Sequence, residues 1–176
     1  RRVHRLCAVD VPRPWEIIAI TFTNKAAGEL KDRLAARLGP SANDIWASTF
    51  HSACVRILRR DAEKLGFPSN FSIYDTSDST SLIKHIIKDF NLDDKTYAPK
   101  VVLGAISRAK DQQIGAQEYL RQAKASGDLF RSKTGEIYAE YMRRMFAAGA
   151  MDFDDLIFFT VQLLQEHEDA RTYWQR

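Results

Sequence analysis

The stretch that decides the fold class is IIAITFTNKAAGEL, which occupies residues 17–30. Its first six residues are apolar or β-branched, a pattern typical of a strand buried on both faces of a parallel sheet. Thr23 or Asn24 can cap the helix that follows, in which apolar residues recur at helical spacing until Gly39-Pro40. We therefore predict a strand over residues 17–22 that leads directly into a helix.

The same succession recurs further along the chain. Residues 45–50 predict a second short strand, and residues 53–65 predict a second helix that ends at Gly66. Strands and helices that alternate with short connections are typical of an open α/β sheet. The predicted fold class is therefore α/β, with a parallel sheet.

Helical signals dominate after Pro68, because residues 71–74 predict at most a short strand. Further helices are expected before Pro12, over residues 82–87 behind a cap at Ser77 or Asp78, over 101–109 behind Pro99, over 118–125, from about 128 to 148, over 153–165 and from 168 onward. We therefore divide the chain into an α/β portion over residues 1–67, an inserted helical subdomain over 68–150 and a helical return over 151–176.

The composition is that of an ordinary globular chain. Its 176 residues are 45% hydrophobic and 28% charged, which excludes a disordered or fibrous protein. Two cysteines are too few for a disulfide framework, and no apolar run approaches the roughly 20 residues that span a bilayer. The basic start lacks the pattern of a secretory signal. We therefore expect an intracellular protein that does not bind a membrane.

Positive charge is concentrated in the first third of the chain. Residues 1–66 carry 12 Lys/Arg against 7 Asp/Glu, whereas residues 151–176 carry 2 against 6. A basic segment is compatible with binding to a phosphate backbone, but solvated helix faces give the same charge pattern. Charge alone therefore leaves both interpretations open.

The first candidate site lies at the predicted end of the first strand, at Thr21, Phe22, Asn24 and Lys25. Ligands of open α/β sheets bind at the carboxyl edge of the strands, and the free N–H groups of a helix start suit a phosphate. The hydroxyl and amide groups add hydrogen bonds, and an exposed Phe22 can stack on an unpaired base. The alternative is a capped helix with Phe22 in the core.

The second candidate site repeats this arrangement after the second strand, at Thr49, His51 and Ser52. Parallel strands end at the same edge of a sheet, so one nucleic-acid strand could reach both sites. His51 also raises the alternatives of a catalytic base for Ser52 or a metal ligand. No second histidine or carboxylate stands nearby at ligand spacing, so we expect a structural or hydrogen-bonding histidine, no catalytic residue and no metal.

Two charged clusters in the second half of the chain are further candidates. Asp152, Asp154 and Asp155 suit either Mg²⁺ or the capping of the apolar helix that follows, and capping is favoured. Arg108 and Lys110 are either phosphate contacts or cations at an exposed helix terminus. The chain contains neither a G-x-x-x-x-G-K-[S/T] phosphate loop nor a G-x-G-x-x-G sequence, so we expect no triphosphate site in it.

Five segments, taken in order, resemble superfamily 1 DNA helicases of the UvrD/PcrA/Rep type. Residues 17–30 look like helicase motif Ia, and residues 47–60 look like motif Ib. The other matching segments are FSIYD at 71–75, AISRAK at 105–110 and MDFDDL at 151–156. The resemblance covers the chain from about Pro14 onward.

The resemblance implies a partial RecA-like sheet of the P-loop NTPase type with an inserted, mainly helical subdomain. It implies a parent enzyme that is an ATP-dependent DNA helicase, an ATP hydrolase that moves 3′ to 5′ on single-stranded DNA and unwinds duplex in repair or replication. In this family ATP and Mg²⁺ are held by the Walker A and DExx motifs, which the present sequence lacks. ATP and Mg²⁺ are therefore expected in the intact parent, whereas no cofactor and no ATPase activity are expected of this chain alone.

The resemblance also implies a DNA-binding surface. The residues expected to bind DNA are Thr21, Phe22, Asn24, Lys25, Thr49, His51, Ser52, Arg108 and Lys110. Expected partners are single-stranded and junction DNA, the second RecA-like domain of the parent and, through exposed strand edges, a second copy of the chain. The expected location is the bacterial cytoplasm, at the nucleoid when DNA is bound. The alternative is a stand-alone, non-catalytic helical module that binds DNA or protein.

Overall fold

The computed structural model describes residues 13–175, which fold into helices joined by short strands. The α-helices are α2 (Asn24–Leu38), α3 (Phe50–Asp61), α4 (Thr76–Asp89), α5 (Pro99–Asp111), α6 (Ala116–Ser126), α7 (Leu129–Ala147), α8 (Phe153–Glu166) and α9 (Glu168–Trp174). The strands are β1 (Ile18–Thr21), β2 (Trp46–Thr49), β3 (Ser72–Tyr74) and β4 (Ala150–Asp152), and the 3-10 turns are η1 (Pro14–Glu16), η2 (Gly39–Asp44) and η3 (Ala62–Leu65). The helix expected before Pro12 lies outside the described residues.

The described strands pair in two small parallel sheets. β1 pairs with β2, so that Thr21 lies opposite Thr49. β3 pairs with β4, so that Tyr74 lies opposite Asp152. The predicted α/β class with parallel pairing is therefore confirmed, whereas β4 was not predicted from the sequence.

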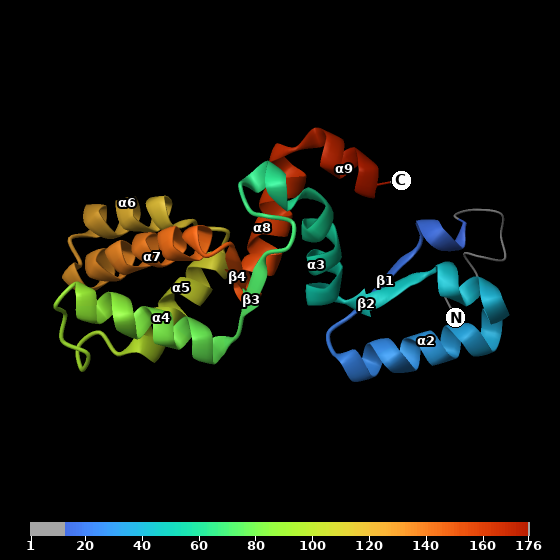
Figure 1. The fold of residues 1–176 in the computed structure, drawn as a ribbon, viewed down its shortest axis with the longest axis horizontal. Coiled ribbons are helices and arrows are strands. Elements are labelled where there is room, and N and C mark those ends of the chain that lie inside the picture. Colours follow the sequence, from blue (N-terminus) through green and yellow to red (C-terminus); the bar gives the residue numbers. More distant parts are fainter. Residues whose placement is uncertain (1–12, 176) are drawn as a thin grey trace.

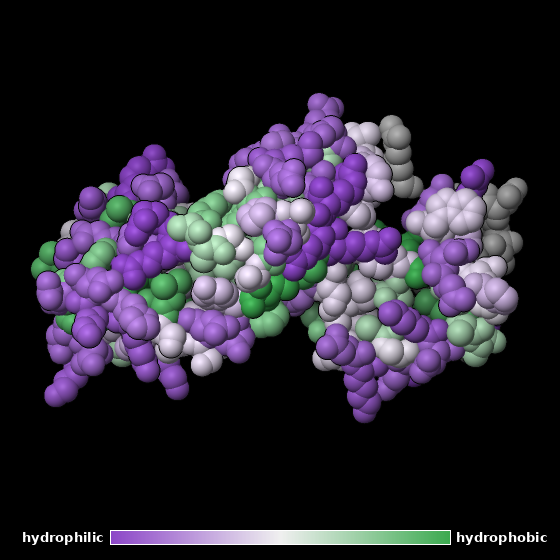
Figure 2. All heavy atoms as spheres, in the orientation of Figure 1, coloured by the Kyte–Doolittle hydropathy of each residue, from purple (hydrophilic) through white to green (hydrophobic). Residues whose placement is uncertain are grey.

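The molecule is elongated, with three parts in a row (Figure 1). β1, β2 and α2 form one end, α3, α8 and α9 form the middle, and α4 to α7 form the other end. On the face drawn in Figure 2, hydrophilic side chains dominate both ends, and hydrophobic side chains reach the surface mainly in the middle. Across the described part of the chain, every helix is too short or too polar to cross a membrane.

Capping side chains start the helices that follow strands. Thr23 begins α2, since its Oγ1 accepts the N–H of Ala26 at 3.1 Å, as the sequence predicted. The cap of α4 is Asp75, whose Oδ1 accepts the N–H groups of Ser77 and Asp78 at 2.7 and 2.8 Å. The prediction that Ser77 or Asp78 caps this helix was therefore wrong by two to three residues, because α4 begins directly after Asp75, the residue that follows the last residue of β3.

The first strand is not buried on both faces, contrary to the prediction. Ile18 and Ile20 are 44% and 41% exposed. The opposite face is covered, because Ile17 and Ala47 pack with apolar residues of α2 and η2 into one cluster. The apolar run predicted a strand correctly, but its burial depends on neighbours that the run itself does not specify.

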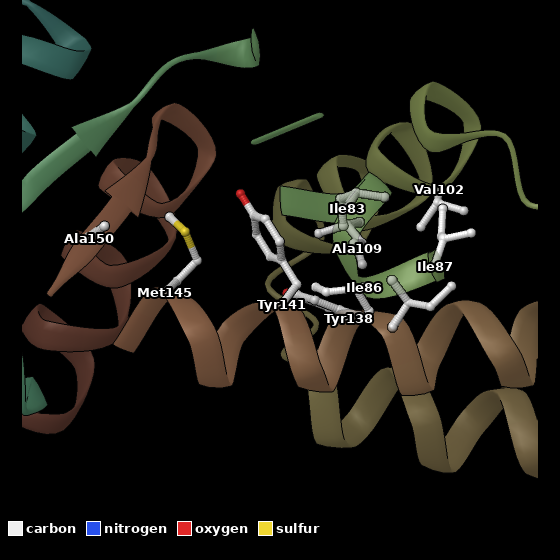
Figure 3. Close-up of a cluster of buried hydrophobic side chains, with 11 residues drawn as sticks. Ile83, Ile86, Ile87, Val102, Ala109, Tyr138, Tyr141, Met145 and Ala150 are labelled. Carbon is white, nitrogen blue, oxygen red and sulfur yellow. The ribbon is translucent and has the colours of Figure 1, made fainter. Parts of the chain in front are cut away.

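Three hydrophobic clusters hold the parts together. The first joins Ile17, Leu34, Ala42, Ile45 and Ala47. The second joins Cys54, Leu58, Ala62, Phe67, Phe71, Met151, Leu156, Phe159, Leu163 and Ala170. The third joins Ile83, Ile86, Ile87, Val102, Ile106, Ala109, Ile137, Tyr138, Tyr141, Met145 and Ala150. Figure 3 shows Tyr141 of α7 at the centre of the third cluster, between the isoleucines of α4 on one side and Met145 and Ala150 on the other.

Candidate nucleic-acid interface

The ends of β1 and β2 form a rim from which two helices start. Thr21 and Thr49 are the last residues of these strands and lie opposite each other. α2 begins three residues after Thr21, and α3 begins directly after Thr49. The two predicted candidate sites therefore lie side by side, at the edge where parallel α/β sheets bind ligands.

The threonine hydroxyls of this rim are occupied by local hydrogen bonds. Thr21 Oγ1 donates to the carbonyl of Thr23 at 3.2 Å. Thr49 Oγ1 accepts the N–H of Ser52 at 3.2 Å and lies 2.9 Å from Ser52 Oγ. Thr49 is buried, so its direct role is to cap α3 and to orient the residues that follow it.

Aromatic side chains line the exposed side of the rim. Phe22 is 88% exposed, and its ring centroid lies 5.3 Å from that of Phe50. The His51 ring meets the Phe153 ring edge-on, with 5.8 Å between centroids. Phe22 is thus not a core residue, which excludes the alternative that placed it there. Exposed rings of this kind are suited to stacking with unpaired bases.

Phe50 and Phe153 were missed as candidate contact residues by the sequence predictions. Both are about half exposed, and each is the first residue of a helix that starts directly after a strand. Phe22 likewise follows the last residue of β1. The signal that could have found them is therefore a phenylalanine immediately after a strand end, repeated at three of the four described strands.

Polar groups accompany these rings. Asn24 and Lys25 lie exposed in the first turn of α2, and Ser52 lies exposed in the first turn of α3. Ser52 Oγ is hydrogen-bonded to Thr49 Oγ1. Asn24, Lys25 and Ser52 can reach a phosphate or sugar beside the aromatic rings.

A groove of about 530 Å³ continues from Phe153 toward the helical end of the molecule. The ends of β3 and β4, the first turn of α4 and one face of α5 form its walls, with Tyr74, Lys100 and Ser107 among the lining residues. The groove connects the rim to the helices that the sequence assigned to the insertion.

Arg108 and Lys110, which were predicted to act together, lie in different surroundings. Arg108 is exposed, whereas Lys110 is only 2% exposed. Residues two apart on a helix point about 200° apart, so one can face solvent while the other faces the interior. The predictions that Lys110 contacts a phosphate or stands at an exposed helix terminus were therefore both wrong.

Lys110 instead forms a buried ion pair with two of the three clustered aspartates. Its Nζ donates to Asp152 Oδ2 at 2.6 Å and lies 2.8 Å from Asp155 Oδ1. Burial opposes the charged form, but Asp155 and Asp152 outweigh it and raise the pKa of Lys110. Burial raises the pKa of Asp155 to about 7, an effect that the Lys110 charge opposes.

The aspartates also cap α8, as favoured from the sequence. Asp152 Oδ1 accepts the N–H of Asp155 at 2.8 Å, and Asp155 Oδ2 accepts the N–H of Asp152 at 3.1 Å. The Lys110 ammonium takes the place that a cation would need between these carboxylates. Within residues 13–175 no group of three His, Cys, Asp or Glu side chains is arranged to hold a metal. The aspartate cluster therefore does not fit a Mg²⁺ ion.

Comparison with known proteins gives consistent results. The sequence model of the UvrD/REP helicase N-terminal domain matches residues 1–176. The chain is 45% identical over 175 residues to the ATP-dependent DNA helicase PcrA of Bacillus subtilis, which covers 99% of the chain and 23% of that protein. It is 42% identical over 177 residues to the ATP-dependent DNA helicase UvrD1 of Mycobacterium tuberculosis, with 100% and 23% covered. The chain thus spans less than a quarter of the length of these relatives.

Proposed function

Because the chain belongs to the UvrD/REP helicase N-terminal domain family, we propose that it is part of an ATP-dependent DNA helicase and that its rim binds single-stranded DNA. The rim consists of Thr21, Phe22, Asn24, Lys25, Thr49, Phe50, His51, Ser52 and Phe153. The observation that carries this proposal is the exposed Phe22 ring at the end of a parallel strand, in contact with Phe50. A largely exposed apolar ring is unfavourable in water, and base stacking would bury it.

The proposal extends to the parent protein. ATP and Mg²⁺ would be used by residues other than those described here, and the motor would move 3′ to 5′ on DNA during repair or replication in a bacterial cytoplasm. Residues 1–67 and 151–176 would belong to a RecA-like motor domain of the P-loop NTPase type, and residues 68–150 would form the inserted helical subdomain. The exposed face that carries Ile18 and Ile20 would be covered by other parts of the parent or, in their absence, by a second copy of this chain.

Phe22→Ala tests the DNA-binding role. We expect the unsubstituted 176-residue chain to bind a labelled single-stranded oligonucleotide weakly and without sequence preference, with a Kd of about 10⁻⁴ to 10⁻⁶ M. The substitution should weaken binding by about 1–3 kcal/mol and leave the salt dependence unchanged, because stacking releases no counterions. Fluorescence anisotropy at several salt concentrations measures both quantities.

Trp15→Ala is a matched control, because Trp15 is also a largely exposed aromatic residue but lies before the amino end of β1, away from the carboxyl ends of the strands that form the rim. This variant should bind DNA with the same Kd as the unsubstituted chain. If Phe22→Ala also has the Kd of the unsubstituted chain and unfolds at the same temperature, the rim is not the DNA-binding surface.

A further inference from the structure

A buried polar cluster lies directly behind the rim, around the carboxylate of Asp152. Its members are Ser79 of α4, Lys110 of α5, Tyr141 of α7, Asp152 of β4 and Asp155 of α8, and each is at most 5% exposed. Two helices of the helical end, α5 and α7, therefore reach this carboxylate directly, and α4 reaches it through the Tyr141 hydroxyl, which lies 3.1 Å from Ser79 Oγ.

Both oxygens of the Asp152 carboxylate are occupied. Oδ2 accepts hydrogen bonds from Lys110 Nζ at 2.6 Å and from the Tyr141 hydroxyl at 2.8 Å. Oδ1 accepts the N–H of Asp155 in the capping of α8. One carboxylate thus ties the helical end of the molecule to the first turn of α8.

Phe153 follows Asp152 directly and is the first residue of α8. Its ring meets that of His51, which lies next to Phe50, the ring neighbour of Phe22. The path from Lys110 to the rim therefore has three steps: an ion pair to Asp152, a peptide bond to Phe153 and a ring contact to His51.

Stability alone does not require a cation at this position. Buried ion pairs can often be replaced by apolar side chains of similar volume without loss of stability. The ammonium fixes the orientation of the Asp152 carboxylate, since one of its N–H groups and the Tyr141 hydroxyl both donate to Oδ2.

We propose that Lys110 is a positioning residue for the DNA-binding rim: by holding Asp152, it fixes Phe153 against His51 and so links the helical end of the molecule to the rim. This inference rests on the proposed function of the rim. It also replaces the direct DNA contact that the sequence predicted for Lys110.

The test uses a double variant, Lys110→Met with Asp152→Asn. Methionine keeps the length of the side chain, and asparagine keeps the ability to cap α8 while removing one of the two carboxylates that would otherwise be buried without a cation. The other carboxylate, Asp155, can take up a proton, because burial already raises its pKa. The NMR signals of the His51 ring protons report the position of the Phe153 ring, and Phe153→Leu defines the shift when that ring is absent. Urea unfolding and binding of a single-stranded oligonucleotide are measured on the same samples.

We expect the double variant to be more stable than Lys110→Met alone, while the His51 signals move toward their Phe153→Leu positions and Kd rises by about three- to tenfold. Tyr141→Phe, which removes the other donor to Asp152, should move the same signals less far in the same direction. A double variant whose His51 signals and Kd match those of the unsubstituted chain would overturn the proposal. If the double variant does not fold, unchanged His51 signals in Tyr141→Phe would overturn it.

Lys133→Met is the control, because its ammonium pairs with Glu136 at 2.6 Å on the partly exposed side of α7. It should leave the His51 signals, Kd and stability unchanged. Failure of the proposed function is recognised separately, because Phe22→Ala would then have the same Kd for DNA as the unsubstituted chain. The His51 signals would still decide whether Lys110 positions Phe153.

Discussion

The two parallel sheets share one local design but differ in their surroundings. In each of them the paired strands lead within a few residues into helices that are capped by a side chain. β1 leaves Ile18 and Ile20 more than 40% exposed, whereas Ala150, Met151 and Asp152 of β4 are all buried. Their partner strands differ less, since β2 alternates half-buried and buried residues and two residues of β3 are exposed. We name the first sheet the exposed sheet, after β1, and the second the buried sheet, after β4. The exposed sheet ends in the exposed Phe22 ring, and the buried sheet ends in an ion pair.

The difference shows that a strand-to-helix junction is open to a ligand only where the surrounding helices leave it exposed. At Thr21 no helix of the described chain covers the following phenylalanine. At Asp152 three helices converge, and the polar groups there bond to one another instead of facing solvent. The same local design can therefore leave side chains exposed at the end of one sheet and bond them to one another at the end of the other.

Breaking the ion pair of the buried sheet should have the largest effect. Lys110→Met alone leaves two buried carboxylates without a cation, so we expect the free energy of unfolding to fall by about 3–5 kcal/mol. Urea unfolding followed by circular dichroism measures this. A loss of less than about 1 kcal/mol would mean that water reaches the carboxylates and that the two sheets differ less than their burial implies.

Truncation of one apolar residue in each sheet tests the same comparison. Met151→Ala removes a fully buried side chain and should lower the free energy of unfolding by about 2–5 kcal/mol. Ile18→Ala removes a side chain that is 44% exposed and should lower it by about 0.5 kcal/mol or less. Equal losses for the two variants would show that the Ile18 face is covered in solution, for instance in a dimer detectable by sedimentation.

The buried sheet should also make stability depend on pH. The pKa of Asp155 is about 7 in the folded chain against an ordinary value of 3.8, so the folded state binds an extra proton between these values. Stability should therefore fall as pH rises from about 4 to 7, by at most about 1.4 kcal/mol per pH unit, and change no further above this range.

Asp155→Asn isolates this contribution, because asparagine does not titrate. The difference in unfolding free energy between parent and variant should change over pH 4–7 and be constant above it. The pKa of Glu140, which Arg143 and Arg144 lower to about 2, acts in the opposite direction below pH 4.5 and cancels in this difference. A difference that is constant from pH 4 to 7 would contradict the prediction.

The smallest expected effect is at the exposed sheet. Lys25→Ala should weaken binding to a single-stranded oligonucleotide only a few-fold and reduce the slope of log K against log salt by about 0.7–1, because one phosphate contact is lost. Anisotropy titrations between low and moderate salt give this slope. Lys31, which lies exposed further along α2, provides the matched control: Lys31→Ala should leave the slope unchanged.

Local signals in the sequence predicted the helices well and the strands in part. Thr23 caps α2 through its own side chain, and Gly66 adopts a left-handed conformation at the end of η3, as expected from their residue types. β4 was missed because three residues before a helix carry almost no period-2 signal, and its partner β3 lies more than 70 residues earlier.

The candidate site shows the same limit. Phe22, Asn24 and Lys25 lie exposed where β1 ends and α2 begins, and a few neighbouring residues are enough to predict this junction. The burial of Lys110 depends on Asp152, 42 residues later, and on Tyr141 of another helix. Spacing on α5 predicts that Arg108 and Lys110 face different directions. It does not predict that two aspartates lie on the side that Lys110 faces.

The pairing of β3 with β4 has a consequence for how the chain can change in length. Residues 75–149 leave the second sheet at the carboxyl end of β3 and return to it at the amino end of the parallel neighbour β4, so their two ends lie only about 14 Å apart. The entropy of closing such a loop grows only with the logarithm of its length, about 0.6 kcal/mol for each doubling. Insertions and deletions on the outer turns of α4 to α7 can therefore accumulate while the strands that anchor this segment, and the rim beyond them, keep their places.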